Sequence, residues 1–134
     1  MRRVFKTRTF TRSMKKTGLT DAALCIAVRE MCVGLIDADL GGGIVKKRVA
    51  LPGYGKRGGA RTIVATKMVG RWFFLFGFRK NERSNIDKDE LRALQEVAAE
   101  LLGFDDQQLT TALNAGEIVE ICNEDNKAQQ PNSR

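Results

Sequence analysis

Two short segments carry the side chains best suited to chemistry on phosphate. The first is the run Lys46-Lys47-Arg48. The second is the glycine-rich stretch 51–61, LPGYGKRGGAR, which contains Lys56, Arg57 and Arg61. An Arg side chain presents a planar fork of N–H donors that matches phosphate, and a Lys beside other cations can have a lowered pKa and act as a base. Both segments therefore predict contact with phosphate groups.

The glycine-rich stretch also contains Gly53-x-Gly55-x-x-Gly58, the spacing of a nucleotide-binding loop. A dinucleotide fingerprint needs a helix after its glycines and an acidic residue about 20 positions further on. Here a strand is expected next, and the next acidic residue is Glu82. A Walker A loop needs Ser or Thr after Gly-Lys, whereas Arg57 follows Lys56. A kinase-type loop needs a larger enzyme core and carboxylates for Mg²⁺. We therefore expect a mobile basic loop that binds no cofactor.

The distribution of charge favours a polyanionic partner. Residues 1–83 contain 19 Lys and Arg against 5 Asp and Glu, whereas residues 84–134 contain 4 against 11. Between Asp39 and Glu82 there are ten basic residues and no acidic one. Such a one-sided region attracts phosphate backbones, so nucleic acid is the favoured ligand. The alternative is a solvated basic face that serves solubility.

Hydrophobic spacing and chain breakers predict an α+β fold, with a small antiparallel sheet packed against N-terminal and C-terminal helices. An edge-like strand over 4–10 should lead into a short helix over 11–16, and Thr20 or Asp21 should cap a second helix reaching Leu35. Three consecutive strands follow over 44–49, 61–66 and 71–78, with a loop over 52–59. The last strand is apolar at successive positions, which predicts a central place in the sheet. Asp87 and Asp105 begin two further helices.

Length and composition indicate one cytoplasmic domain. The chain has 134 residues, 43% of them hydrophobic, and its longest apolar run, 72–78, is too short to span a bilayer. Neither a secretion signal nor a membrane partner is expected. The three cysteines and the absence of histidine argue against a metal site, so we expect Cys25, Cys32 and Cys122 to be reduced core thiols. Residues 1–121 are predicted to form the domain and 122–134 a polar, disordered tail.

Three blocks together resemble a known family. They are the segment DADLGGGIVKKRV that begins at Asp37, the segment GGART that begins at Gly58, and the segment FGFRKNERSNI that begins at Phe76. In this order and spacing they resemble RelE-type toxins of bacterial type II toxin-antitoxin pairs, of the RelE/ParE superfamily, in the branch near HigB. The resemblance covers about residues 1–121.

The resemblance implies an mRNA interferase, an endoribonuclease that cleaves messages in the ribosomal A site and inhibits translation. It also implies a co-encoded antitoxin, in this branch a helix-turn-helix protein, through which alone operator DNA would be contacted. Arg61 matches the family's Gly-x-Arg position, and Lys80 and Arg83 match its basic Lys-x-Glu-Arg-Ser segment. Arg79 is a neighbour that could assist. Asn81 stands where RelE itself has a basic residue, and Asp87 falls near the family's tyrosine, so the general acid stays unassigned.

Chemistry at the 2′-hydroxyl of RNA needs a base for that hydroxyl, cations for the charge on the phosphoryl oxygens, and an acid for the leaving oxygen. It requires no metal. The predicted catalytic residues are Arg61, Lys46, Lys47, Arg48 and Lys80. The predicted RNA-binding residues are Lys56, Arg57, Tyr54, Arg79 and Arg83.

Each of these assignments has a structural alternative. Tyr54 could stack on a base or simply face solvent in a turn. The run 46–48 could protect an edge strand against aggregation, and Arg83 could pair with Glu82, Asp87 or another acid. Two other functions also remain open. A gyrase-inhibiting toxin of the ParE type shares the fold, and a non-catalytic RNA-binding module would use the basic face alone.

Overall fold

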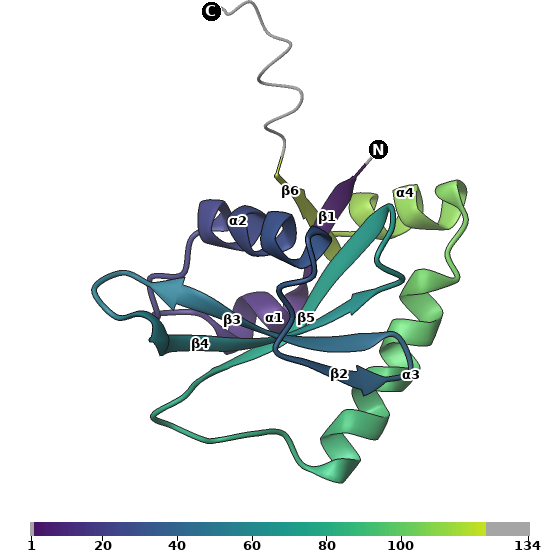
Figure 1. Ribbon diagram of the computed structural model, residues 1–134. Helices are drawn as coiled ribbons and strands as arrows, with labels where there is room; N and C mark the ends of the chain where they lie inside the picture. The colour runs from purple at the N-terminus through teal and green to yellow at the C-terminus, as the bar shows by residue number, and fades with distance from the viewer. Residues whose placement is uncertain (1, 123–134) are drawn as a thin grey trace, which may run out of the picture.

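The computed structural model describes residues 2–122 as one six-stranded sheet with helices on both faces (Figure 1). The strands are β1 (Arg3–Thr7), β2 (Ala38–Gly41), β3 (Ile44–Leu51), β4 (Gly55–Thr66), β5 (Arg71–Arg79) and β6 (Ile118–Ile121). The helices are α1 (Arg8–Ser13), α2 (Asp21–Cys32), α3 (Lys88–Leu102) and α4 (Asp106–Asn114). The predicted α+β class is confirmed. The expected tail beyond Cys122 lies outside the described residues.

The sheet separates two hydrophobic clusters. One joins Phe10, Leu24 and Met31, from α1 and α2, to Val45 and Phe74 of the sheet. We call this the α2 side. The other joins residues of α3 and α4 to the opposite face, and we call it the α3 side. It includes Phe5, Ile44, Ile63, Phe73, Ala98, Leu101 and Leu109. Because successive residues of a strand point to opposite faces, each strand contributes side chains to both clusters.

The strand order is β2-β3-β4-β5-β1-β6. The three-stranded meander is confirmed as β3, β4 and β5, which pair antiparallel, and β5 lies inside the sheet as predicted. The prediction for the first strand was wrong, because β1 lies between β5 and β6 and runs parallel to β5. Its neighbouring residues Val4 and Phe5 are both buried, one on each face. Weak alternation in a basic segment concealed a strand covered on both sides.

Helix boundaries follow local capping. The side chain of Thr20 accepts a hydrogen bond at the start of α2, and Asp87 and Asp105 form complete capping boxes with Glu90 and Gln108. These N-termini agree with the sequence. However, α1 begins at Arg8, earlier than expected, and α2 ends at Cys32, so that Leu35 is exposed. Leu35 continues the apolar spacing of α2 in the sequence, but it lies beyond the end of the helix.

The predicted loop over 52–59 is shorter in the structure. Residues 52–54 form the turn, and β4 already begins at Gly55, which pairs with Leu51. A Cβ atom on Gly59 would lie 2.3 Å from the Val49 carbonyl oxygen and 2.7 Å from that of Gly55. The glycines therefore allow close packing of a hairpin, where their number had suggested a mobile loop.

The hairpin's outer strand is also covered. β2 was not predicted, and it pairs antiparallel with β3, so β3 is not an edge strand. The charges of the run 46–48 consequently do not protect an open sheet edge.

A bulge changes the alternation along β5. Ile63 pairs with Phe76 and Val64 with Phe74, so Leu75 has no partner in the register. An unpaired residue moves the following side chains to the other face. Phe74 therefore lies on the α2 side, whereas Phe76 and Phe78 both lie on the α3 side.

The cysteines differ from the sequence prediction. Cys25 of α2 and Cys122, which directly follows β6, form a disulfide across 97 residues of sequence, and Cys32 is an exposed free thiol. Pairing of β6 with β1 brings Cys122 to the cluster that contains Leu24 and Met31. Sequence spacing does not report such a long-range approach. Within the described chain, no helix is long and apolar enough to cross a membrane.

Candidate functional site

Three of the predicted catalytic residues share the α3 side of the β3–β4 hairpin. Arg48 and Arg61 are register partners on the two strands, and Lys46 lies two residues before Arg48 on the same face. Side chains of directly opposed residues are close neighbours in an antiparallel pair. We call Lys46, Arg48 and Arg61 the cation group. Ile44 and Ile63 are buried on this side of the sheet. The three cations lie an even number of positions from these residues along the same strands, so their side chains point to the same side.

Asp37, just before β2, anchors this group. Its carboxylate accepts hydrogen bonds from the backbone N–H of Arg48 at 2.7 Å and forms an ion pair with Arg48 Nε at 2.8 Å. The Asp37 N–H in turn donates to the Lys46 carbonyl at 3.0 Å. Sequence reasoning placed Asp37 in a family block but gave it no role. It orients Arg48 and reduces the repulsion between the two neighbouring guanidinium groups.

Arg61 lies in a cationic, partly desolvated place. Burial lowers its pKa below the ordinary value, the charge of Arg48 lowers it further, and the Asp37 carboxylate partly offsets both effects. An Arg side chain nevertheless stays protonated at neutral pH. Among the described residues, its side chain donates one hydrogen bond, from Nη1 to the Lys56 carbonyl, and this bond is long at 3.4 Å. Arg61 therefore presents a charged guanidinium that an anion can approach.

The structure separates Lys47 from its sequence neighbours. Its side chain is only 4% exposed on the α2 side and forms an ion pair with Glu30 of α2 at 2.9 Å. Lys56, predicted to bind RNA, also pairs with Glu30, at 2.7 Å. These contacts hold the β3–β4 hairpin against α2. Hydrogen bonds from the two lysines lower the pKa of Glu30, and the bond from Lys56 has the larger effect. Neither lysine belongs to the cation group.

Two more predicted RNA-binding residues contact each other. The Arg79 guanidinium lies 5.0 Å from the ring centre of Tyr54, which is exposed in the turn before β4. Arg79 pairs in register with Ala60, a residue of the α2-side cluster, so it too points away from the cation group.

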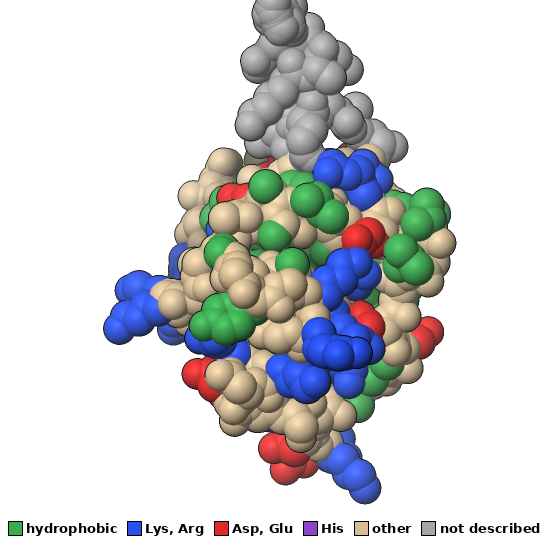
Figure 2. All heavy atoms as spheres, turned by 60° about the vertical axis from the view of Figure 1, so that its left-hand side comes forward, with side chains coloured by type: hydrophobic (Ala, Val, Ile, Leu, Met, Phe, Trp, Pro, Cys, Tyr) green, Lys and Arg blue, Asp and Glu red, His purple; other side chains and the backbone are tan. Residues whose placement is uncertain are grey.

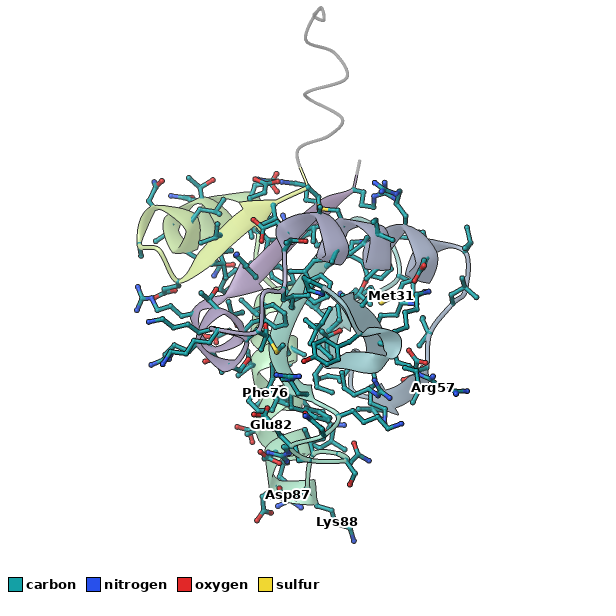
Figure 3. The ribbon with its side chains drawn as sticks, turned by 90° about the vertical axis from the view of Figure 1, so that its left-hand side faces the viewer. Met31, Arg57, Phe76, Glu82, Asp87 and Lys88 are labelled. Carbon is teal, nitrogen blue, oxygen red and sulfur yellow. A yellow bond between two sulfur atoms is a disulfide. The ribbon has the colours of Figure 1, made fainter. Side chains whose placement is uncertain are left out.

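The remaining cations lie at the ends of strands. Arg57 lies at the outer end of the hairpin and points away from the body of the molecule (Figure 3). Lys80 directly follows β5, and its N–H lies 3.5 Å from the Gly59 carbonyl oxygen. Lys and Arg side chains gather on the side shown in Figure 2, with a few acidic side chains among them.

Arg83 forms an ion pair with Glu90, an acid that was not named among its possible partners from the sequence. Its guanidinium forms two hydrogen bonds with the Glu90 carboxylate, one of them from Nη1 at 3.0 Å, and Nε donates to the Asn85 carbonyl at 3.0 Å. The group lies over the rings of Phe76 and Phe78, 5.9 and 5.4 Å from their centres. Phe78 is the register partner of Arg61. Arg83 therefore lies on the face that carries the cation group.

Comparison with known protein families identifies the chain. The family model described as "RelE toxin of RelE / RelB toxin-antitoxin system" matches residues 2–121. The chain belongs to this RelE toxin family. No curated protein matches it in the corresponding comparison. The family match confirms the resemblance to RelE-type toxins, and it implies a cognate antitoxin as partner.

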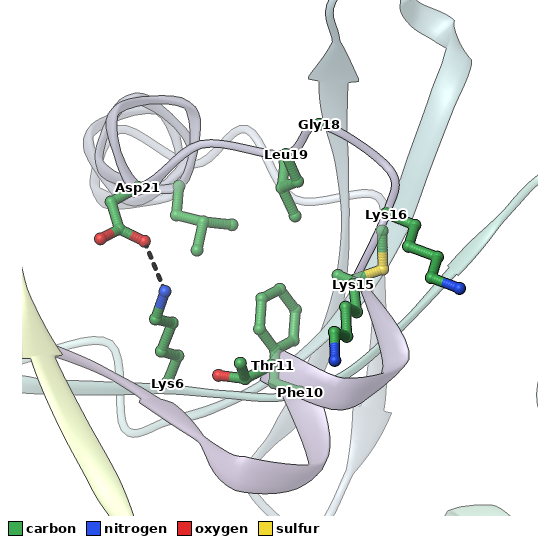
Figure 4. Close-up of a pocket in the computed structure, with 10 residues that line it drawn as sticks. Lys6, Phe10, Thr11, Lys15, Lys16, Gly18, Leu19 and Asp21 are labelled. Carbon is green, nitrogen blue, oxygen red and sulfur yellow. Dashed lines mark hydrogen bonds and ion pairs between the residues drawn. The ribbon is translucent and has the colours of Figure 1, made fainter.

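The toxin also has a pocket between α1 and α2. A pocket of about 230 Å³ has Phe10, Met14 and Leu24 in its lining, and an ion pair of 2.8 Å between Lys6 and Asp21 lies beside it (Figure 4). These apolar residues belong to the α2-side cluster. None of the predicted site residues lines the pocket. Among residues 2–122 of the toxin, no three side chains that could hold a metal ion lie together.

Proposed function

We propose that this RelE-family toxin is a metal-independent, ribosome-dependent mRNA endoribonuclease that inhibits translation. The observation that carries the proposal is the cation group, in which Arg48 and Arg61 lie opposite each other on one face and Asp37 fixes Arg48. RelE-family toxins generally cleave mRNA, which supports the same activity here.

The proposed reaction is attack by a ribose 2′-hydroxyl on the adjacent phosphorus. The new bond closes a 2′,3′-cyclic phosphate, the bond to the 5′-oxygen breaks, and that oxygen receives a proton. Negative charge grows on the phosphoryl oxygens in this step, and fixed cations that face them lower its barrier. Arg61 is proposed to stabilise this charge, with Arg48 beside it.

The other predicted catalytic residues differ in their contacts, and we propose a different role for each. Lys46 is the proposed base for the 2′-hydroxyl, because it shares the face of Arg48 and Arg61 and has no ion pair within the described chain. Lys80 remains a proposed contact at the end of β5. Lys47 is proposed to act through structure, since it is held by Glu30 on the other face.

RNA binding outside the cation group is proposed to rely mainly on Arg57, which protrudes from the hairpin (Figure 3). Lys56, Tyr54 and Arg79 lie on the α2 side, and ligand contact there would compete with the Glu30 ion pair or with the packing of Arg79 on Tyr54. The antitoxin is proposed to be of the helix-turn-helix type of the HigB branch and to be the component that contacts operator DNA.

Mapping of mRNA 5′ ends in growing cells tests this function. The toxin is induced as wild type and as Arg61→Ala, and primer extension locates new ends. New ends inside translated codons with wild type, absent with Arg61→Ala, are expected. Cleavage that persists without translation would contradict ribosome dependence. Intact mRNA together with DNA damage would indicate a gyrase inhibitor, and intact mRNA with RNA binding would indicate a non-catalytic module.

A further inference from the structure

Arg83 has an arrangement that differs from that of the other cations. The central carbon of its guanidinium lies over the rings of Phe76 and Phe78, and its nitrogens donate to Glu90 and to the Asn85 carbonyl. A guanidinium has five N–H donors, and three of its nitrogens already donate here. One surface of the group is therefore packed, most of its edge is used, and its side chain still remains 36% exposed.

The surroundings fix this arrangement before any ligand arrives. The bulge at Leu75 brings Phe76 and Phe78 to the α3 side, where they form the surface beneath Arg83. Glu90 is itself held by the capping box, in which the Asp87 N–H donates to its Oε1 at 2.9 Å. A side chain restrained on its face and edge loses little conformational entropy when a ligand packs against it.

The pairing with Glu90 makes phosphate an unfavourable ligand for Arg83. A phosphate that approached the guanidinium edge would meet a carboxylate, and the positive charge is already compensated. A neutral planar group can instead pack on the exposed surface of the guanidinium without displacing Glu90. Proteins that bind single-stranded RNA stack bases on aromatic rings and on Arg guanidinium planes in this way.

Arg83 also lies beside the proposed site of cleavage. Phe78, beneath Arg83, is the register partner of Arg61, so the two arginines border the same patch of the sheet. We propose that Arg83 is a stacking surface for a nucleobase of the RNA adjoining the phosphate that Arg61 contacts, and that it is not a phosphate ligand. This inference rests on the proposed endoribonuclease function.

A double-mutant cycle between Arg83 and the base tests the proposal. The RNA is a single-stranded oligomer of about ten nucleotides, a length within the usual site sizes, with 2′-O-methyl groups that prevent cleavage. Copies with one abasic nucleotide at each successive position are compared with the intact RNA, and binding to the full-length chain is measured. With wild type, loss of one base should weaken binding about tenfold. Arg83→Lys keeps the charge and loses the plane. It should weaken binding of intact RNA by the same factor as the loss of that base does in wild type, and it should leave binding of the abasic RNA unchanged.

The dependence of binding on salt separates stacking from phosphate contact. Loss of one phosphate contact to a single strand lowers the slope of log K against log salt by about 0.7. Arg83→Lys and Arg83→Ala should both leave the slope of the wild type, whereas the control Arg57→Ala should lower it. Arg83→Gln has a smaller planar amide, so it should bind intact RNA more tightly than Arg83→Ala and less tightly than wild type. Thermal unfolding confirms that each variant is folded.

The outcomes distinguish this inference from the function on which it rests. If Arg83→Lys binds intact RNA as wild type does, or if it loses affinity equally for intact and abasic RNA, stacking is refuted. A lower salt slope for Arg83→Ala would likewise identify a phosphate ligand. If the wild type cleaves mRNA in translating cells but does not bind the free RNA, the stacking role is refuted and the endoribonuclease proposal stands. If the wild type cleaves no mRNA in translating cells, the endoribonuclease proposal fails, and the stacking role fails with it.

Discussion

The two sides of the β3–β4 hairpin use the same residue types for different purposes. On the α2 side, Lys47 and Lys56 converge on Glu30 and hold the hairpin to α2, and the nearby disulfide joins α2 to the end of β6. On the α3 side, Arg48 has one carboxylate partner, Asp37, and Lys46 and Arg61 have no ion pair among residues 2–122. Cations on the first side stabilise the fold, and those on the second side are available to a ligand.

This difference shows that a count of basic residues overestimates the cations that are left without an acidic partner. The run Lys46-Lys47-Arg48 looks uniform in sequence, yet the alternation of a strand sends its middle residue to the opposite face. A basic segment of a sheet therefore has to be divided by face before its charge is assigned to a ligand. The following experiments test whether the two faces can be changed independently.

The largest expected effect is on catalysis from the α3 side. Arg61→Ala should lower the rate of mRNA cleavage about 10²- to 10³-fold, the usual cost of losing one group that stabilises transition-state charge. Its thermal midpoint should stay near that of wild type. Lys56→Ala, on the α2 side, is the matched control and should keep most of the activity. Equal losses of rate in the two variants would break the distinction between the faces.

The disulfide should give the largest loss of stability on the α2 side. Cys122→Ser removes the link to Cys25 and should lower the free energy of unfolding by about 2–4 kcal/mol, because a long closed loop is released in the unfolded chain. Urea denaturation measures the change, and cleavage per folded molecule should hold. Cys32→Ser, at the exposed thiol, serves as control. An unchanged midpoint for Cys122→Ser would mean that the link does not stabilise this side.

Neighbouring lysines offer the sharpest comparison. Lys47→Met should lower the free energy of unfolding by about 1–2 kcal/mol, since it removes one partner of the mostly buried Glu30 pair while Lys56 remains. Lys46→Met should change stability by less than about 0.5 kcal/mol and should impair cleavage instead. Chemical denaturation and a cleavage assay on both variants give the four values. The opposite pattern would reassign the two lysines.

Acid should weaken the Glu30 ion pairs of the α2 side, which is the smallest effect of this series. The pKa of Glu30 is lowered in the folded state, so its contribution to stability is present above the unfolded value near 4.5 and is lost as pH falls through the folded pKa. The stability difference between wild type and Glu30→Gln should therefore shrink between about pH 6 and pH 3. Urea midpoints across this range measure it. Glu100→Gln, on the exposed face of α3, should show no comparable trend.

Much of the architecture could be predicted because its signals are local. Thr20, Asp87 and Asp105 cap helices through residues three positions away, and the strands of the meander follow one another in the chain. The place of β1 could not be predicted in this way, because its partners are β5 and β6, far along the sequence. The same distance concealed the pairing of Cys25 with Cys122.

The residues of the candidate site could be selected from the sequence, but their grouping on the two faces of the sheet could not. Lys46, Arg48 and Arg61 were selected from sequence, and the register of β3 with β4 places them together. The acidic partners were missed, since nothing in the spacing of Glu30 shows that it meets Lys47 and Lys56. Glu90 gave a signal only as a capping residue, although one carboxylate both closes the capping box and pairs with Arg83.

The parallel pairing of β1 with β5 sets the order in which the toxin can be completed during its own synthesis. The first strand to leave the ribosome has to wait for residues 71–74 on one edge and for 118–121 on the other. The β3–β4 hairpin, with the cation group, can form much earlier from local contacts. A product that stops before Ile118 would leave one edge of β1 unpaired and Arg3 without its partner Glu120. A chain that ended there would thus have an unfinished sheet that proteases can attack, and the sheet is completed only when residues up to Ile121 have been made.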